Sequence, residues 1–334
     1  MPEPGASRRA TAVDVAREAG VSRATVGFVL NRTEGQTISE STRERVLEAA
    51  QRLGYRPNSA ARTLRSGRSR LVLLVLPDWP IDAAGLRDYL ETVESALAEH
   101  DYCLVTQTRP TGGRGRPLWE ALNPDLVHGI TPFSADDVAS MRRCGVLEIV
   151  PDPVDPEPVD LSVAVSRGPR LQVEHLYACG HRDLAYVTHR TARPAFLVDA
   201  RYRAAQEAAR SLGLPPLRHR YVDHRDGSAD RAVREWREAG VTGVAAFNDD
   251  AAAVVVGAAV RAGIDVPGQL AVIGHDDTLP AAVFVPGLST VRIDTTALGR
   301  SFAALVLHRL DGRPLPPRAS LEDAVLVRRE STRR

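Results

Sequence analysis

The stretch TAVDVAREAGVSRATVGFVLN, residues 11–31, decides the fold of the N-terminal part of this chain. Thr11, followed by Asp14 three residues later, has the spacing of a capping box at the start of a helix, and Gly20 supplies the chain reversal that ends it. Ser22 can cap a second helix, whose apolar side packs back on the first. Two short helices joined by a tight turn form a helix-turn-helix, whose second helix enters the major groove of DNA. A helical hairpin inside a larger core is the alternative.

A third helix is predicted over residues 41–54, STRERVLEAAQRLG, with Ser39 or Ser41 as its cap and Gly54 as its stop. Three short helices around a few apolar residues make a minimal independent domain, which we expect to span residues 10–56. Its predicted core consists of the apolar residues at helical spacing, which are Val13, Ala16, Ala19, Val26, Val29, Leu30, Val46, Leu47, Ala50 and Leu53.

A short linker follows, YRPNSAARTLRSGRSR, residues 55–70. Pro57 breaks the chain, and the stretch between it and Gly67 holds room for less than two turns of helix. A helix that short is not stable alone in water, so we expect residues 57–70, the hinge helix and linker, to order only when something binds them. Leu64 is the one large apolar side chain in this segment of small residues and Arg.

These segments together resemble the LacI/GalR family of bacterial transcription regulators. The resemblance rests on segments that occur in the family's order and approximate spacing: DVAREAGVSRATV (14–26), VLN (29–31), STRERVLEAAQRLGYRPN (41–58) and AARTLRSGRS (60–69). With the part of the chain that follows, it extends from about residue 10 to the C-terminus. It implies a sequence-specific repressor that binds a palindromic operator in double-stranded DNA as a homodimer. A small-molecule effector, a sugar or another neutral metabolite, is expected to control it from a cleft between two lobes.

The resemblance also implies which residues bind DNA. In this sequence they are Thr11, Ser22, Arg23, Ala24, Thr25, Gly27, Phe28, Asn31, Ser39, Tyr55, Asn58, Ala61, Arg62 and Leu64. The phosphate-contact positions, which orient the module without reading sequence, are matched by Thr11, Asn31, Ser39, Tyr55 and Asn58. Arg23, Ala24 and Thr25 begin the recognition helix, which faces base edges.

Three of these residues have a second interpretation or depart from the family. Relatives commonly have Ser-Arg where this chain has Gly27-Phe28, and Phe cannot make the bidentate contact of Arg to guanine. Phe28 can instead pack on a thymine methyl, or within the small domain. The resemblance implies that the Leu64 side chains of two copies wedge open a base step from the minor groove. Leu64 could also cover the domain junction.

The charge of the chain is unevenly distributed. Residues 1–70 hold 13 Arg and 7 acidic residues, a net charge of +6, whereas the remaining 30 Arg and 35 acidic residues give −5. A basic N-terminal module on a mildly acidic body is the electrostatic pattern of a nucleic-acid binder with a separate second function. A solvated charged face would not explain why the excess of Arg coincides with the helix-turn-helix.

Several classes of protein are excluded by what the sequence lacks. Residues 1–9, expected to be disordered, carry no apolar leader, and no apolar run is long enough for a membrane span, so we expect a cytoplasmic protein. Three scattered cysteines argue against a disulfide framework and a zinc site. The motifs GxSxG, HExxH and GxxxxGK[ST] do not occur, no GxGxxG follows a strand, and the histidines are scattered. We therefore expect no enzyme, no cofactor and no metal.

From residue 71 the pattern changes to alternating strands and helices. The run LVLLVLP (71–77) is continuously apolar, as expected of a parallel strand buried on both faces. Further strands are predicted at 102–107, 128–133, 146–151, 161–166, 184–188, 221–222, 243–248, 270–277 and 323–328, most of them separated by helices. Two successive series of this kind predict two doubly wound α/β lobes, which resemble the periplasmic binding proteins.

The resemblance implies how the chain divides between these lobes. The effector-binding and dimerisation domain is expected over residues 71–334. A helix of about 295–310 and the final strand return to the first and second lobes, so the first lobe is expected at about 71–162 with 293–318, and the second at about 163–292 with 319–330.

Polar and aromatic side chains follow several predicted strands, at the edge where open α/β sheets bind ligands. Asp78 and Trp79 follow the first strand, Asn248 and Asp249 a later one, and Asp276 the strand after that. Trp can stack on a ring, while Asn and Asp supply polar groups that fix a ligand. Asp249 could instead cap the next helix. The resemblance implies that Asn248 and Asp276 hold neighbouring hydroxyl groups of a sugar.

One position departs from the family pattern. Relatives often carry an Arg followed three residues later by Gly, and Val198 and Arg201 stand at these two positions here. Loss of the Arg at Val198 indicates a neutral effector that is more apolar than a typical sugar, or no effector at all. The predicted effector-binding residues are Asp78, Trp79, Val198, Asn248 and Asp276.

Two other classes of protein fit only part of the sequence. A solute-binding transport protein would explain the cleft but not residues 10–65 or the missing leader. A Rossmann-type enzyme would need a phosphate-binding loop that the sequence lacks, and turnover with a nucleotide cofactor would favour it.

Overall fold

The computed structural model describes residues 10–30, 37–55, 63, 67–78, 85–109, 116–151, 163–316 and 324–332. The chain divides into two compact units, residues 1–69 and 70–334. Some predicted site residues lie outside the described ranges, namely Asn31, Asn58, Ala61, Arg62, Leu64 and Trp79. In the described part of the chain, no helix is both long and apolar enough to cross a bilayer.

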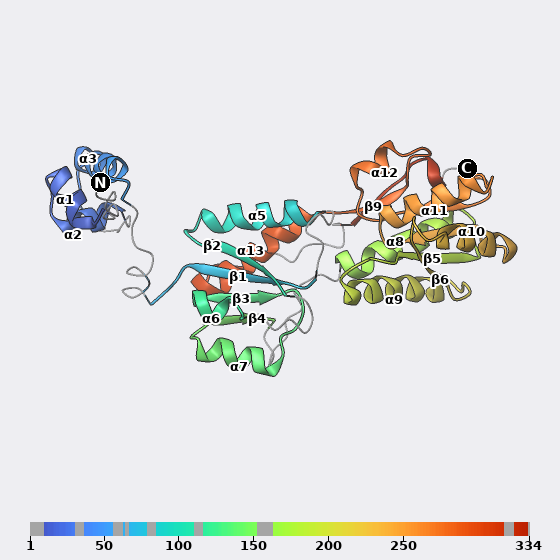
Figure 1. Ribbon diagram of the computed structural model, residues 1–334, viewed down its shortest axis with the longest axis horizontal. Coiled ribbons are helices and arrows are strands. Elements are labelled where there is room, and N and C mark those ends of the chain that lie inside the picture. Colours follow the sequence, from blue (N-terminus) through green and yellow to red (C-terminus); the bar gives the residue numbers. More distant parts are fainter. Residues whose placement is uncertain are drawn as a thin grey trace, which may run out of the picture. The chain divides into compact units, whose positions relative to one another are not determined.

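The first unit contains three short helices, α1 (Ala12–Ala19), α2 (Arg23–Leu30) and α3 (Glu40–Arg52), as Figure 1 shows. The predicted capping box is present, since Thr11 N–H donates to Asp14 Oδ2 at 2.9 Å and Asp14 N–H donates back to the Thr11 hydroxyl. Ser22 and Ser39 cap α2 and α3 through hydroxyl oxygens that accept from the backbone N–H three residues later. Gly20 ends α1 with φ +64°, a left-handed conformation that favours glycine.

The core of this unit differs in part from the predicted one. Val15 and Ala49 are fully buried, whereas Val13 and Leu47 remain 47% and 48% exposed and Leu53 is 37% exposed. Apolar residues lie on more than one side of α1 and α3, so helical spacing alone did not identify the stripe that faces the neighbouring helices. The other predicted core residues are buried or packed against the core.

The second unit contains two parallel sheets, one in each lobe (Figure 1). The strand order is β2-β1-β3-β4 in the first lobe and β6-β5-β7-β8 in the second, the same order twice, as expected for two doubly wound lobes. The strands are β1 (Leu71–Leu76), β2 (Cys103–Thr108), β3 (Leu126–Gly129), β4 (Glu148–Val150), β5 (Leu184–His189), β6 (Arg218–Val222), β7 (Gly243–Ala246) and β8 (Ala271–Ile273). A separate antiparallel pair is formed by β9 (Thr290–Ile293) and β10 (Ala324–Val327).

Helices cover both faces of each sheet. In the first lobe α5 and α13 pack on one face and α6 and α7 on the other, while in the second lobe α8 and α9 lie opposite α10 and α11. Their bounds are α5 (Leu86–Ala98), α6 (Trp119–Leu122), α7 (Ala135–Arg143), α8 (Gly168–Ala178), α9 (Ala195–Ser211), α10 (Ser228–Glu238), α11 (Asp249–Arg261), α12 (Leu279–Val283) and α13 (Thr295–Asp311). Because α13 follows the second sheet in sequence but packs on the first, the chain returns to the first lobe.

The prediction of a strand at 161–166 was wrong for residues 163–166, the part of it that the structure describes. Val163–Arg167 form a π-helical turn that leads directly into α8, and Val165 packs against the core of the second lobe. A short apolar run does not distinguish a strand from a buried helical segment. Gly168, at the start of α8, lies so close to the ring of His275 that a Cβ at this position would overlap with it. This close approach places α8 directly beside the chain that follows β8.

Candidate functional site

The first turn of α2 is exposed in the helix-turn-helix. Arg23 and Ala24 are exposed and Thr25 is half-buried, while Val26 and Val29 on the same helix are buried. The buried side of α2 therefore faces the other two helices, and its first turn is accessible to a partner. An accessible first turn is what recognition of base edges requires.

Arg23 differs from most of its neighbours in having no carboxylate partner among the described residues. Arg17, Arg43 and Arg52 each lie within 4 Å of a carboxylate oxygen, at 3.7, 3.6 and 3.3 Å. Phe28 is half-buried and is not among the described side chains that pack against the core of this unit. Tyr55, by contrast, packs against that core.

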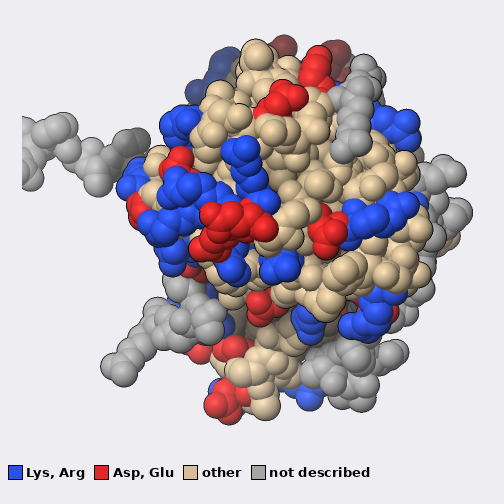
Figure 2. Space-filling model, turned by 90° about the vertical axis from the view of Figure 1, so that its right-hand side faces the viewer, with Lys and Arg blue, Asp and Glu red and all other residues tan. Residues whose placement is uncertain are grey.

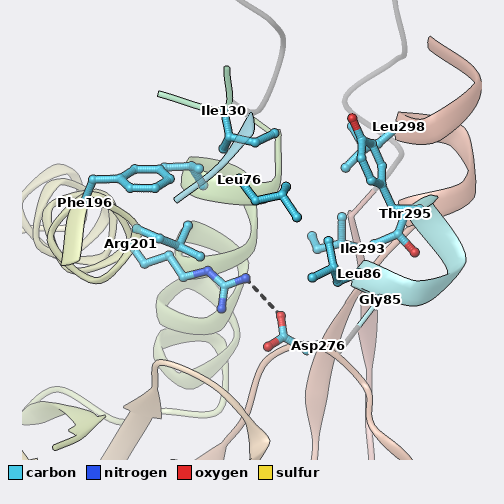
Figure 3. A pocket seen from close by; sticks show the side chains of 13 residues that line it. Leu76, Gly85, Leu86, Ile130, Phe196, Arg201, Asp276, Ile293, Thr295 and Leu298 are labelled. Atoms are coloured by element: carbon cyan, nitrogen blue, oxygen red, sulfur yellow. Dashed lines mark hydrogen bonds and ion pairs between the residues drawn. The ribbon is translucent and has the colours of Figure 1, made fainter. Parts of the chain in front are cut away.

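A cavity in the second unit lies between elements of both lobes (Figure 3). The space between the side chains amounts to about 720 Å³, including the part open to solvent. Its walls are mostly hydrocarbon, and they are made by Leu76, Gly85, Leu86, Tyr89, Ile130, Val165, Phe196, Leu197, Arg201, Asp276, Ile293, Thr295 and Leu298. Asp276, as predicted, follows β8 at the carboxyl edge of the second sheet.

An ion pair between Arg201 and Asp276 forms the polar side of the cavity (Figure 3). Arg201 Nη2 donates to Asp276 Oδ1 at 2.9 Å, and Nη1 donates to the carbonyl oxygen of Phe247 at 2.7 Å. The guanidinium carbon lies 4.9 Å from the centre of the Phe247 ring. The ring of His275, fully buried, places Nδ1 2.6 Å from the same Oδ1.

The charges of this group are fixed by their surroundings. Burial alone would raise the pKa of Asp276, but the charge of Arg201 and the hydrogen bonds from Arg201 and His275 outweigh it, so the pKa lies well below its usual range. Burial and the charge of Arg201 lower the pKa of His275. Asp276 is therefore a carboxylate at neutral pH, and a neutral His275 donates its Nδ1–H to it.

The structure corrects the inference drawn from Val198. Val198 is 5% exposed, belongs to the apolar core of the second lobe and is not among the residues that line the cavity. The cavity does contain a cation, because Arg201, three residues later on α9, reaches Asp276. The absence of an Arg at Val198 therefore does not leave the cavity without a cation.

Asn248, and not Asp249, is the residue that caps α11. Asn248 is the cap of α11, since its Oδ1 accepts from Ala251 N–H at 3.0 Å, and it does not line this cavity. Asp249 was the other candidate for this cap. Its side chain is instead buried, with 2% of the residue exposed, and accepts hydrogen bonds from Thr278 and Thr290. Burial raises the pKa of Asp249 to about 6. A role of the Asn248 amide toward a ligand stays a prediction.

Asp78 lies beside a second cavity. Its carboxylate pairs with Arg193 at 2.9 Å, and both side chains are about half exposed. The lining of this cavity includes Arg109 and Asp137, which pair at 3.0 Å. The two cavities share Leu76 and Phe196 in their linings, and a role of Asp78 toward a ligand stays a prediction.

Sequence reasoning missed most of the lining of the first cavity. The apolar residues on α5 and α13, such as Leu86 and Leu298, fit a helix-core pattern equally well, and no local signal distinguishes the two roles. The sequence alone showed only that Arg201 stands where relatives often have Gly, and it did not indicate that this side chain reaches the cavity.

The structure also brings together His189, Asp223 and His224, whose ligand atoms lie within 4.8 Å of one another. The Nδ1 of His189 accepts from Thr191 N–H, and Nε2 of His224 accepts from Arg225 Nε. These nitrogens are thus engaged in a hydrogen-bonded cluster that sequence reasoning, which treated the histidines as scattered, did not foresee.

Comparison with known proteins covers both units. Residues 11–58 match the model for bacterial regulatory proteins of the lacI family, and residues 173–332 match that for a periplasmic binding protein-like domain. The HTH-type transcriptional regulator CelR of Thermobifida fusca is 30% identical over 347 residues, which cover 96% of this chain and 98% of that protein. The HTH-type transcriptional regulator GalR of Escherichia coli (strain K12) is 29% identical over 333 residues, covering 96% and 95%. The lac repressor dimer bound to operator and the anti-inducer ONPF has a TM-score of 0.72 at 22% identity, covering 97% of this chain and 99% of that one.

Proposed function

Because this chain belongs to the lacI family of bacterial regulatory proteins, we propose that it represses transcription by binding a roughly palindromic operator as a homodimer, under the control of a small molecule held between its lobes. The observation that carries the proposal is the exposed first turn of α2, where Arg23 has no carboxylate partner among the described residues.

The charge and geometry of the first unit support binding to the major groove. Arg23 can make a bidentate contact to the O6 and N7 atoms of guanine, and Thr25 can bond to a base or a phosphate. Thr11, Ser22 and Ser39 lie at helix N-termini, where backbone N–H groups also favour phosphate. Phe28 is available for a thymine methyl, because it is not part of the described core.

An exposed apolar surface on the second lobe supports the homodimer. Leu279, Val283 and Val285, on and just after α12, are 77%, 69% and 86% exposed. Apolar side chains this exposed, and this close together in sequence, are typical of a protein interface. Figure 2 shows the outer end of this lobe, where charged groups of both signs gather in one area and wide uncharged areas lie beside them. A twofold axis through such a surface would pair two DNA-binding units with two halves of a palindrome.

Two Arg substitutions test the DNA-reading role. Arg23→Ala should weaken binding to the preferred operator by about 10-fold or more, since a bidentate contact to guanine contributes about 1–3 kcal/mol. Arg52→Ala removes the same charge from an exposed position that is paired with Glu18, so it should have a much smaller effect. Gel shifts with operators selected from genomic fragments measure both, and wild-type affinity should fall steeply as salt rises. Equal affinity of the wild type for selected and random DNA at moderate salt would contradict the proposal.

A charge placed in the apolar surface tests the homodimer. Val283→Asp should shift the protein from dimer to monomer in light scattering and reduce operator binding, because it buries a carboxylate in the interface. Leu147→Asp, at a residue of the first lobe that is 54% exposed, is the control and should remain dimeric. A Val283→Asp variant that is still dimeric at low micromolar concentration would assign the interface to another surface.

A further inference from the structure

The cavity between the lobes has hydrocarbon walls on several sides. Leu76 and Ile130 come from the ends of strands in the first lobe, Leu298 from α13, and Phe196 from α9 in the second lobe, as Figure 3 shows. A sugar carries hydroxyl groups around its whole ring, and most of them would face these walls without a hydrogen-bond partner. Burying unpaired polar groups is unfavourable, so the walls fit an apolar body better than a sugar ring.

The polar groups on this side of the cavity carry no net charge. Arg201 and Asp276 neutralise each other, and His275 beside them is neutral. An anionic ligand would meet the Asp276 carboxylate. The Arg201 guanidinium is held by that carboxylate and by the Phe247 carbonyl through its two Nη atoms, and its Nε is buried. A cationic ligand would meet the buried guanidinium. A neutral ligand avoids both repulsions.

One acceptor in this group is still open. Both hydrogen bonds to the Asp276 side chain, from Arg201 and from His275, use Oδ1. Among the described residues, none donates to Oδ2, and 19% of the side chain is exposed. Arg201 and His275 hold this carboxylate in one orientation and leave Oδ2 as an acceptor at the edge of an otherwise apolar space.

We propose that the effector is a neutral, largely apolar ring compound with a single N–H or O–H group that donates to Asp276 Oδ2, rather than a sugar. This inference rests on the proposed function, whose control site it specifies. Arg201 acts as a positioning residue, because it fixes the Asp276 carboxylate and takes up the charge that would otherwise attract a cation.

A matched set of probes tests this chemistry with the full-length protein. Indole has an apolar bicyclic body and one N–H donor, 1-methylindole has the same body without the donor, indole-3-carboxylate adds a negative charge, tryptamine adds a positive charge, and glucose represents a sugar. Isothermal titration should show indole binding at least about 10-fold more tightly than any of the other four, because only indole combines the apolar body, a single donor for the Asp276 carboxylate and no net charge.

Two variants separate the acceptor from the walls. Asp276→Asn should abolish the preference for indole over 1-methylindole. Ile130→Ser, on the wall and away from the ion pair, should weaken both probes by a similar factor and keep the preference. Glu207→Gln, at an exposed ion pair with Arg210 on α9, is the control and should bind as the wild type does. Circular dichroism of each variant checks that it is folded.

The outcomes that would overturn the inference are specific. The inference is wrong if indole does not bind even at the highest concentration at which it dissolves. It is also wrong if 1-methylindole binds as tightly as indole, or if glucose or a charged analogue binds more tightly than indole. Gel shifts with the same probes test the proposed control separately. If indole binds but operator affinity does not change, the ligand class stands and control from this cavity fails. If glucose alone changes operator affinity, control stands and the ligand class is wrong.

Discussion

The two units of this molecule use arginine in opposite ways. Arg23 in the first unit is exposed and has no carboxylate partner among the described residues, whereas Arg201 in the second is 6% exposed and paired with Asp276. An exposed guanidinium stays hydrated at little cost and remains available for phosphate or guanine. A buried one is costly to leave unpaired, so its hydrogen bonds are made within the protein. The first unit thus leaves an exposed guanidinium unpaired with any described carboxylate, whereas the second uses a buried guanidinium to hold the Asp276 carboxylate in place.

The largest effect is expected where the buried pair is broken. Arg201→Leu leaves the Asp276 carboxylate without its cation, so the free energy of unfolding of the second unit should fall by about 3–5 kcal/mol. Urea unfolding of the full chain, followed by circular dichroism, measures it. The double variant Arg201→Leu/Asp276→Leu should recover a large part of the loss, because no unpaired charge remains. If Arg201→Leu lowers the free energy of unfolding by less than about 1 kcal/mol, the Arg201–Asp276 pair is hydrated like an exposed one. Arg201 would then not differ from Arg23 in the way described above.

A second buried carboxylate sharpens the comparison, because it has no cationic partner in the described structure. The folded pKa of Asp249 is about 6, above the unfolded value of about 3.9. The protonated form is therefore favoured by folding, and the stability that it contributes is present below about pH 4 and is lost as the pH rises through 6. The free energy of unfolding of the wild type, relative to Asp249→Asn, should fall by about 2 kcal/mol between pH 4 and pH 7.

Urea unfolding of both proteins at four or five pH values measures this difference. A difference that is flat, or that rises with pH, would show that the three hydrogen bonds from Thr278 and Thr290 stabilise the Asp249 carboxylate enough to cancel the effect of burial.

The capping box of α1 should have a smaller and local effect. Thr11→Ala removes the hydroxyl that accepts from Asp14 N–H, which should destabilise the first unit by about 1 kcal/mol. Hydrogen exchange in the full chain should report faster exchange in α1 and unchanged protection of β5 and β7. Faster exchange in both units would show that they do not unfold independently.

The smallest effect is expected for an exposed pair in the first unit. Arg52 and Glu18 lie 3.3 Å apart with side chains 64% and 43% exposed. Arg52→Ala should change the stability of this unit by less than about 1 kcal/mol, since solvent screens such pairs. Thermal unfolding of the full chain measures it, and a larger loss would mean that the Arg52 side chain packs on the helix surface as well.

The parts of the fold that could be predicted have local signals. The helix-turn-helix depends on a cap, a glycine and a second cap within a dozen residues, so each helix could be placed before its neighbours were known. The continuous apolar run of β1 likewise predicted a strand covered on both faces. The run at 161–166 was misassigned, because Val163–Arg167 form a π-helical turn in which the half-buried Val165 packs against the core of the second lobe.

The cavity was predicted only in outline. The carboxyl ends of parallel strands indicated Asp276, which lines the cavity, whereas the apolar, neutral character of the effector stays a prediction. The reason given for it was wrong, since the cation assigned as lost at Val198 is supplied by Arg201. Which of two residues three positions apart on α9 reaches the cavity depends on how that helix is rotated against its sheet.

Short-range patterns in the sequence were enough to distinguish the two units, to place the caps and turns of the first, and to order the strands and helices of the second. Packing between distant elements established which apolar stripe of α1 is buried, that α13 packs beside α5, and that Arg201 meets Asp276 across 75 residues of chain. The difference lies in how far apart in sequence the interacting residues are. Caps and turns are stabilised by hydrogen bonds between residues three or four apart, whereas a buried ion pair and the walls of a cavity are stable only when elements distant in sequence have packed together and excluded water.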